Sequence, residues 1–311
     1  MLITLSKCGI MYRFLDSVHR GRNELWRYAF TVFLSFIVSN LGAGFIAAIF
    51  IAAAVILSRG VLSPEIISGG FSGPILLLLV AVSFSASLFF LYVGVRFIHK
   101  REFISAVNAR GYLDWRRILR GALVWLLIVG VVDGVSMIID PSGFRFSFNP
   151  SSFGWLLLLA LIAFPVQASF EEIFFRGYLM QGMWSVIRKP VPLIILNSAI
   201  FAVMHWWNGT SITMSLSIVI STFIIGVALA VTALADDGLE LAMGVHIANN
   251  LYVSVIHSSP DSGLGDLPSI IISPTDPYSS PVFLIIASLV MILILFRGRY
   301  DDVLRIFRDH Y

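Results

Sequence analysis

Long runs of apolar residues, separated by short polar segments, make up most of the chain. A helix needs about 20 mostly apolar residues to cross the hydrocarbon core of a bilayer, because a backbone amide left unpaired in lipid is costly. By this criterion the pattern predicts an all-α membrane protein, a polytopic bundle of about eight transmembrane helices. The expected spans are 29–57, 73–98, 121–139, 154–181, 191–207, 212–235, 239–257 and 281–297.

The positions of the basic residues predict the orientation of these spans. Lysine and arginine collect in the cytoplasmic loops of membrane proteins. If the N-terminus lies inside, the inner segments hold 18 of the 21 Lys and Arg residues. The outer loops then hold Arg59 and Arg145, and Arg176 lies within a span. We therefore predict an integral protein of the cell (plasma) membrane with both termini in the cytoplasm.

Composition excludes several classes of protein. Hydrophobic residues make up 58% of the chain and charged residues only 13%, whereas soluble domains carry about 25% charged residues. The net charge of +3 is too small and too dispersed for a nucleic-acid-binding protein. Membrane lipids are the expected surroundings instead. The single cysteine, Cys8, excludes an intramolecular disulfide.

The spans and the segments between them predict five regions. The segment 99–120 interleaves basic and aromatic residues, which is typical of an amphipathic helix on an anionic leaflet, although an ordinary solvated connector fits the same pattern. The regions are a cytoplasmic N-terminal segment (1–28), a three-helix membrane region (29–139) that includes the basic interfacial segment, a core (150–257), an exterior loop (258–280), and a last transmembrane helix with a basic tail (281–311).

Ionisable residues inside the predicted spans are the main functional signal. Each charged group at the bilayer centre costs about 2.5–3.5 kcal/mol on insertion scales, so these groups must meet one another or line a wet cavity. Asp133 in the third span is an additional candidate, which we expect to be paired structurally or to lie near an interface. The main set occupies the fourth, fifth and seventh spans: Glu171, Glu172, Arg176, His205, His246 and Asn250.

Helical spacing suggests how these residues divide the chemistry. Glu172 and Arg176 are four residues apart in the orientation that favours an ion pair, and Glu171 points about 100° away around the axis. Glu171 is therefore left free to act, with His205, as a general base toward water. On a further span, His246 shares a helix face with Asn250. This pair could donate hydrogen bonds to the oxyanion that forms when water attacks a carbonyl.

Three short motifs resemble those of the CPBP intramembrane endopeptidases, which include type II CAAX prenyl proteases and bacteriocin-processing and immunity proteins. Residues 170–179 (FEEIFFRGYL) contain the E-E-x-x-x-R pattern, residues 201–205 (FAVMH) match F-x-x-x-H, and residues 246–250 (HIANN) match H-x-x-x-N. Their order and their separate spans are typical of the family over about residues 150–257. The resemblance implies an endopeptidase with an intramembrane site, acting on a membrane-associated peptide or protein, with lipidated CAAX-type proteins as one candidate class.

Several alternatives stay open at the level of the sequence. Glu172 and Arg176 either orient Glu171 as an ion pair or contact the substrate directly. We expect no cofactor, but zinc is possible, with Glu171, His205 and His246 as its ligands. The same buried acids and imidazoles would also suit a proton-coupled transporter. A non-catalytic immunity or scaffold protein is a further alternative.

Overall fold

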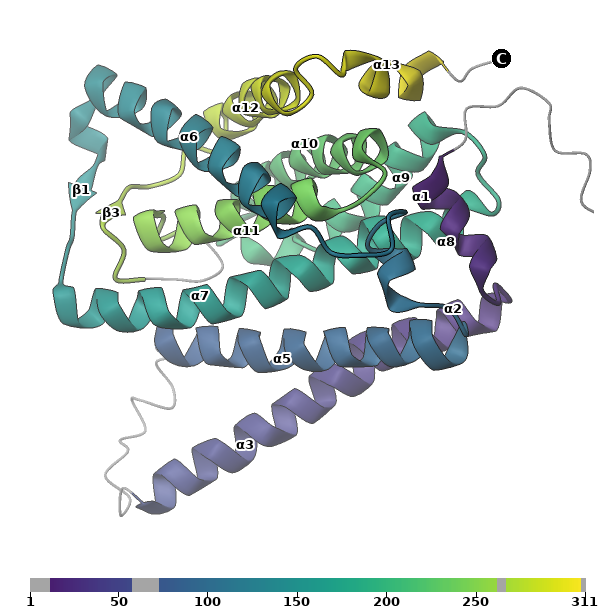
Figure 1. The fold of residues 1–311 in the computed structure, drawn as a ribbon. Coiled ribbons are helices and arrows are strands. Elements are labelled where there is room, and N and C mark those ends of the chain that lie inside the picture. Colours follow the sequence, from purple (N-terminus) through teal and green to yellow (C-terminus); the bar gives the residue numbers. More distant parts are fainter. Residues whose placement is uncertain (1–11, 58–72, 262–266, 309–311) are drawn as a thin grey trace, which may run out of the picture.

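The computed structural model describes residues 12–57, 73–261 and 267–308 (Figure 1). Cys8 and Arg59 lie outside the described residues. The N-terminal half contains these helices and this strand: α1 (Arg13–Asp16), η1 (Ser17–Arg20), α2 (Leu25–Val32), η2 (Phe33–Val38), α3 (Ser39–Leu57), α5 (Gly73–Val93), η3 (Gly94–Ile98), η4 (Phe103–Ala106), α6 (Trp115–Ile139), η5 (Pro141–Gly143) and β1 (Arg145–Phe146). The C-terminal half contains α7 (Pro150–Glu172), η6 (Ile173–Leu179), α8 (Met180–Trp184), α9 (Pro190–Val203), η7 (Trp206–Asn208), α10 (Ile212–Asp236), α11 (Glu240–Leu251), η8 (Tyr252–Ile256), β2 (His257–Ser258), β3 (Ile271–Ile272), α12 (Ser279–Leu295) and α13 (Tyr300–Arg308).

The predicted all-α membrane bundle is confirmed, and the number of long spans is slightly smaller than eight. Within the described residues, six helices are long and apolar enough to cross a membrane. A seventh candidate is α12 together with α13, which are bent by 119°. The predicted span 239–257 corresponds to α11 and η8, which together are shorter than a standard crossing. This helix lies among its neighbours at the centre of the bundle (Figure 1).

Short polar side chains define where several helices begin. Asn149 precedes Pro150 and accepts hydrogen bonds from the amides of Ser151 and Ser152, so it caps the start of α7. Asp114 caps α6 in the same way. Such caps satisfy amides that have no partner within their own helix. They fix the starts of two long helices, and α7 carries part of the predicted site.

The contact between α6 and α11 depends on two glycines. A Cβ atom added to Gly121 would lie 2.2 Å from the carbonyl oxygen of Leu241, and one added to Gly244 would lie 1.9 Å from the carbonyl oxygen of Ile118. Only residues without a Cβ allow two helix backbones to approach so closely, as in other membrane helix pairs. This close packing determines the position of α11, the helix that carries His246.

The prediction of an amphipathic surface helix for residues 99–120 was wrong. The segment contains the short 3₁₀ helix η4, and α6 begins only at Trp115. His99 and Arg101 are buried, and the Arg101 guanidinium donates a hydrogen bond of 2.7 Å to Gln181 on α8. The basic residues of this segment therefore partly serve to pack the loop against the bundle, which a pattern of residue types alone does not reveal.

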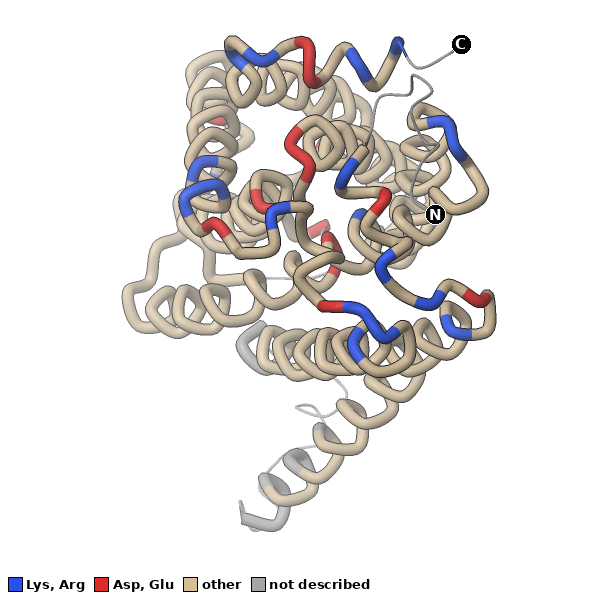
Figure 2. The backbone as a smooth tube through the Cα atoms, turned by 45° about the vertical axis from the view of Figure 1, so that its right-hand side comes forward, with Lys and Arg blue, Asp and Glu red and all other residues tan. Residues whose placement is uncertain are grey.

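Charged residues gather at the end of the bundle that carries α1 and α8 (Figure 2). There Asp236 forms ion pairs with Arg117 and Arg299, and Glu240 pairs with Arg110 at 2.5 Å. These contacts tie the α10–α11 turn to the start of α6 and to the segment before α13. At the other end, a small sheet has the strand order β1-β3-β2. In it, β3 pairs antiparallel with β1 and parallel with β2.

Candidate active site

The hairpin formed by the fourth and fifth long helices brings Glu171 and the region of His205 to a similar depth. The fourth helix runs from Pro150 through η6 to Trp184. At 1.5 Å per residue, Glu171 therefore lies about 20 Å from the C-terminal end of this helix. The returning helix α9 has 14 residues, which also rise about 20 Å. His205 follows α9 directly, in a turn. Because α9 is short, the turn lies at about the depth of Glu171 along the helix axes.

Glu172 and Arg176 form the buried ion pair that their spacing predicts. The Arg176 guanidinium donates to Glu172 Oε1 at 2.9 Å, and both side chains are fully buried. Arg176 also donates to the carbonyl oxygen of Gly226 on α10, at 3.3 Å. Its guanidinium carbon lies 4.1 Å from the centre of the Phe201 ring. Arg176 therefore connects three helices, and it sits in η6, a π-helical stretch of the kind often found at functional sites.

Glu171 keeps one carboxylate oxygen without a partner. Gln167, one turn earlier on α7, donates to Glu171 Oε1 at 3.2 Å. Glu171 Oε2 is buried and has no hydrogen-bond partner among the described residues, although His246 Nε2 lies 3.5 Å away. A buried carboxylate oxygen without a donor is costly and therefore uncommon in a folded protein. It is the kind of atom that can bind and deprotonate a water molecule.

His246 lies between the two glutamates. Its Nδ1 is 2.7 Å from Glu172 Oε1, and its Nε2 faces Glu171. A carboxylate can only accept a hydrogen bond, so Nδ1 carries a proton and donates it to Glu172. The sequence analysis had paired Glu172 with Arg176 alone. In the structure the carboxylate of Glu172 also orients His246.

His205 is connected to the same cluster through Phe201. Its Nδ1 lies 2.9 Å from the carbonyl oxygen of Phe201, so this nitrogen is the protonated one. The Phe201 ring packs at 4.7 Å from the His205 ring and at 6.0 Å from the His246 ring. His205 is half-buried, and its Nε2 has no hydrogen-bond partner among the described residues. The two imidazoles therefore lie near the same phenylalanine, with His246 as the one beside Glu171.

Asn250 follows His246 by one helical turn, and a second asparagine determines which of its atoms is free. Asn249 donates to Asn250 Oδ1 at 3.3 Å, and Trp125 on α6 donates to Asn249 Oδ1 at 3.2 Å. With its oxygen engaged, Asn250 keeps its amide N–H groups available as donors. The structure thus places Asn250 on the same helix as His246, with its amide supported by α6.

The sequence analysis missed two residues that support this arrangement. Gln167 holds Glu171, and Trp125 holds Asn249. The sequence did contain a signal for Gln167, because its carboxamide side chain lies in an apolar span one helical turn before Glu171. Nothing in the sequence pointed to Trp125, since its contact depends on how α6 crosses α11.

The predicted zinc ligands do not form a metal-binding group in this structure. Among the described residues, no three His, Cys, Asp or Glu side chains are arranged to hold one metal ion. Glu171 and His246 approach each other, but His205 contacts neither of them directly.

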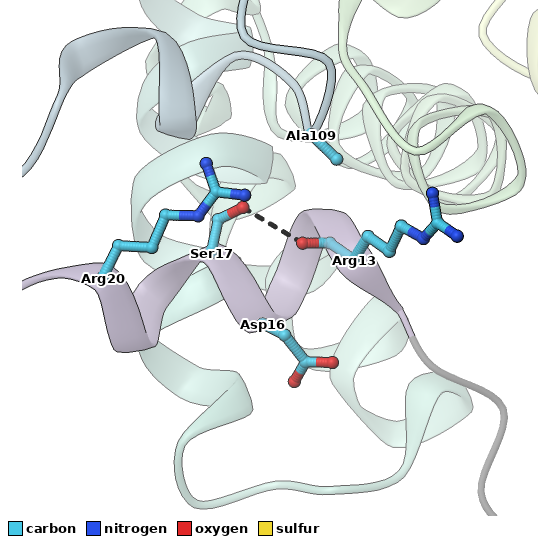
Figure 3. A pocket seen from close by; sticks show the side chains of 5 residues that line it. All are labelled: Arg13, Asp16, Ser17, Arg20 and Ala109. Atoms are coloured by element: carbon cyan, nitrogen blue, oxygen red, sulfur yellow. Dashed lines mark hydrogen bonds between the residues drawn. The ribbon is translucent and has the colours of Figure 1, made fainter. Parts of the chain in front are cut away.

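One surface cavity lies apart from these residues. It has a volume of about 310 Å³ and is lined by residues of α1 and η1 together with Ala109. In Figure 3 the side chains of Arg13 and Arg20 extend to opposite sides of it, and the Ser17 hydroxyl donates to the carbonyl oxygen of Arg13. None of the three motifs contributes to this cavity, so it does not belong to the candidate active site.

Comparison with known proteins identifies the region that contains the motifs. Residues 153–252 match the family described as type II CAAX prenyl endopeptidase Rce1-like. These residues form an Rce1-like domain. The match covers Glu171, His205, His246 and Asn250, and it confirms the family resemblance. The match supports a CAAX-type membrane endopeptidase in general terms, and the apolar helices make the chain an integral membrane protein.

A second comparison extends the similarity beyond the Rce1-like domain. YyaK of Bacillus subtilis (strain 168), a protein described as uncharacterized, is 29% identical over 273 residues. The alignment covers 87% of this chain and 91% of that protein. No solved structure matches the chain significantly.

Proposed function

We propose that the Rce1-like domain hydrolyses a peptide bond of a membrane-associated substrate, with Glu171 and His205 activating water and with His246 and Asn250 stabilising the oxyanion. Glu172 and Arg176 support this site. The observation that carries the proposal is the free Glu171 Oε2, buried beside an oriented imidazole. Lipidated CAAX-type proteins are one substrate class, because the family description names them.

The first step needs a base for the attacking water. Glu171 Oε2 would accept a proton from water, while Gln167 holds the other carboxylate oxygen and so limits rotation of the group. His205 would assist through Nε2, whose lone pair is free because Nδ1 donates to the Phe201 carbonyl. General-base catalysis of this kind contributes typically 10²–10⁴-fold to a rate.

His246 is one proposed donor to the oxyanion. Its Nδ1–H already donates to Glu172, so the ring can donate to an oxyanion only as an imidazolium, through a proton on Nε2. This nitrogen faces Glu171, where the attacking water would bind. The free amide N–H of Asn250 would be a second donor. One such donor is worth about 3 kcal/mol of transition-state stabilisation.

The last step returns the proton to the leaving amine. After water attacks, Glu171 holds the proton taken from it, and collapse of the tetrahedral intermediate requires a proton on the departing nitrogen. Glu171 or His205 would donate this proton, so that the site returns to its starting state. No metal ion enters the scheme, and we propose a glutamate endopeptidase rather than a zinc enzyme.

The orientation and substrate access follow from the charge distribution. The basic and acidic groups at the end with α1 and α8 support our proposal that this end and both termini face the cytoplasm. The plasma membrane is the proposed location. A substrate would then approach the site from the cytoplasmic half of the bilayer.

A peptide-cleavage assay tests the proposal. The purified protein in detergent is incubated with a library of lipidated C-terminal peptides and with unlipidated peptides, and products are mapped by mass spectrometry. We expect cleavage at an internal peptide bond, lost in His205→Ala and His246→Ala and reduced at least tenfold in Asn250→Ala. Unchanged cleavage in all three variants would contradict the assignment.

A chelator experiment tests the metal question separately. Full activity in protein shown by metal analysis to be free of zinc supports the glutamate mechanism. Loss of activity on chelation, with recovery on adding zinc, contradicts it. A proton-coupled transporter would instead leave every peptide intact and acidify vesicles in a substrate-dependent manner.

A further inference from the structure

A second cluster of chemically active side chains lies at the end of the bundle with the small sheet. Asp133 is on α6, His257 on β2, and Ser273 directly follows β3. His257 Nδ1 lies 2.6 Å from Asp133 Oδ2, and His257 Nε2 lies 2.6 Å from Ser273 Oγ. The three residues are far apart in the sequence and meet only through the fold, at the opposite end of the bundle from α8 (Figure 1).

The hydrogen bonds fix the proton positions in this cluster. Asp133 as a carboxylate can only accept, so His257 Nδ1 carries the proton and donates to it. The neutral imidazole then has its lone pair on Nε2, and the Ser273 hydroxyl donates to that nitrogen. Tyr252 also donates to Asp133 Oδ2, at 2.7 Å, which helps to hold the carboxylate in place. Nucleophile, base and orienting acid therefore stand in the order used by serine hydrolases.

An apolar cavity adjoins these groups. It has a volume of about 350 Å³ and is lined by Met137, Pro141, Phe144, Phe146 and Ile271. Met137 lies one helical turn after Asp133, Ile271 precedes Ser273 by two residues, and the Phe144 ring packs 5.4 Å from the His257 ring. Each member of the cluster thus has a neighbour in the cavity wall. His257, Asp133 and Ser273 are all partly exposed, so a substrate can reach them.

We propose that Ser273, His257 and Asp133 form a second nucleophilic site, which reacts with esters of small apolar acyl groups. Ser273 Oγ would attack the acyl carbon while its proton passes to His257 Nε2. The C–O bond to the leaving alcohol then breaks, and His257 returns the proton to that alcohol. Water, deprotonated by His257, hydrolyses the acyl-serine and restores the site.

The backbone around Ser273 limits how fast this reaction can be. The Ser273 amide donates to the carbonyl oxygen of Ser258, and Pro274 has no amide hydrogen. Neither of these amides can therefore stabilise an oxyanion, and the loss of one such donor slows acyl transfer by about 10²–10³-fold. Reactive probes are accordingly needed to detect the site.

Labelling with an alkyl fluorophosphonate tests this proposal on the full-length protein in detergent. The serine oxygen attacks phosphorus and fluoride leaves, so the adduct is stable and can be located by mass spectrometry. We expect the label on Ser273, with its rate lowered at least tenfold in His257→Gln and in Asp133→Asn. Ser280→Ala is the matched control, because the Ser280 hydroxyl lies at the start of α12 and donates to the Asp276 carbonyl rather than to a histidine.

Three results would overturn the proposal. They are the absence of a label on folded wild-type protein, a label that maps to another residue, and a labelling rate that His257→Gln leaves unchanged. Mapping on the wild-type protein needs no variant to fold, and a thermal melt checks each variant that is used. A slow release of p-nitrophenol from p-nitrophenyl butyrate, absent in Ser273→Ala, is the expected result with an ester.

Discussion

Replacement of Arg176 by methionine tests how the buried charges hold the active site together. In the wild type, Arg176 donates to Glu172 at 2.9 Å, and neither side chain is exposed to solvent. Methionine fills a similar volume but carries no charge. Among the described residues, the Arg176→Met variant therefore leaves Glu172 with His246 as its one side-chain hydrogen-bond partner, in a region where water cannot screen the carboxylate.

The expected loss of stability is large for a single substitution. Breaking a buried ion pair by removing one partner costs about 3–5 kcal/mol, and the remaining contact with His246 favours the lower end, about 3 kcal/mol. One kcal/mol changes the melting temperature of a domain of 150–250 residues by roughly 2–4 °C. We therefore expect a decrease of about 6–12 °C for Arg176→Met.

A double-mutant cycle in detergent measures the pairwise part of this effect. Thermal unfolding is followed for Glu172→Gln, Arg176→Met and the double variant. Because the double variant leaves no unpaired charge, its loss should be smaller than the sum of the single losses by at least about 1 kcal/mol. A melting temperature of Arg176→Met within 2 °C of the wild type, or strictly additive losses, would refute the reasoning.

Three further predictions concern other parts of the structure. Gly121→Ala should lower the melting temperature strongly, because its Cβ would lie 2.2 Å from the carbonyl oxygen of Leu241, whereas Gly130→Ala on the same helix has open space and should not; equal melting temperatures would argue against the close helix contact. Gln167→Ala should leave folding intact and slow peptide cleavage about fivefold, since the Glu171 carboxylate loses one hydrogen bond worth about 1 kcal/mol; an unchanged kcat would exclude that role. Burial, together with the nearby Arg101 and Arg27, lowers the pKa of His99 to about 4, so the unfolded state takes up a proton first as the pH falls. The free energy of unfolding should therefore decrease as the pH falls from 6.5 toward 4, by about 2 kcal/mol at pH 5. A His99→Gln variant whose melting temperature depends on pH as in the wild type would contradict this.

The sequence was sufficient to predict the class of fold and one contact within the candidate site. Apolar length alone indicates membrane helices, because lipid tolerates few other backbone structures. The spacing of Glu172 and Arg176 predicted their ion pair, since residues four apart share a helix face. These features depend on local geometry, which a sequence encodes directly.

Features that depend on how helices cross could not be predicted. The contact of His246 with Glu172 depends on the rotation of α11 against η6, and the position of α11 depends on backbone contacts at Gly121 and Gly244. The segment 99–120 misled the analysis because basic and aromatic residues suit a membrane surface and a packed loop equally well. Likewise, Asp133, His257 and Ser273 meet only because β3 lies beside β2.

The single-turnover rate constant of the Glu171→Gln variant tests the central claim most directly. Glutamine preserves the shape of the side chain and can still accept from Gln167, but it cannot take a proton from water. With the best peptide substrate from the cleavage screen, we predict a fall of at least about 10³-fold in the rate of cleavage, with substrate binding unchanged. A rate equal to that of the wild type would contradict the assignment of Glu171 as the base.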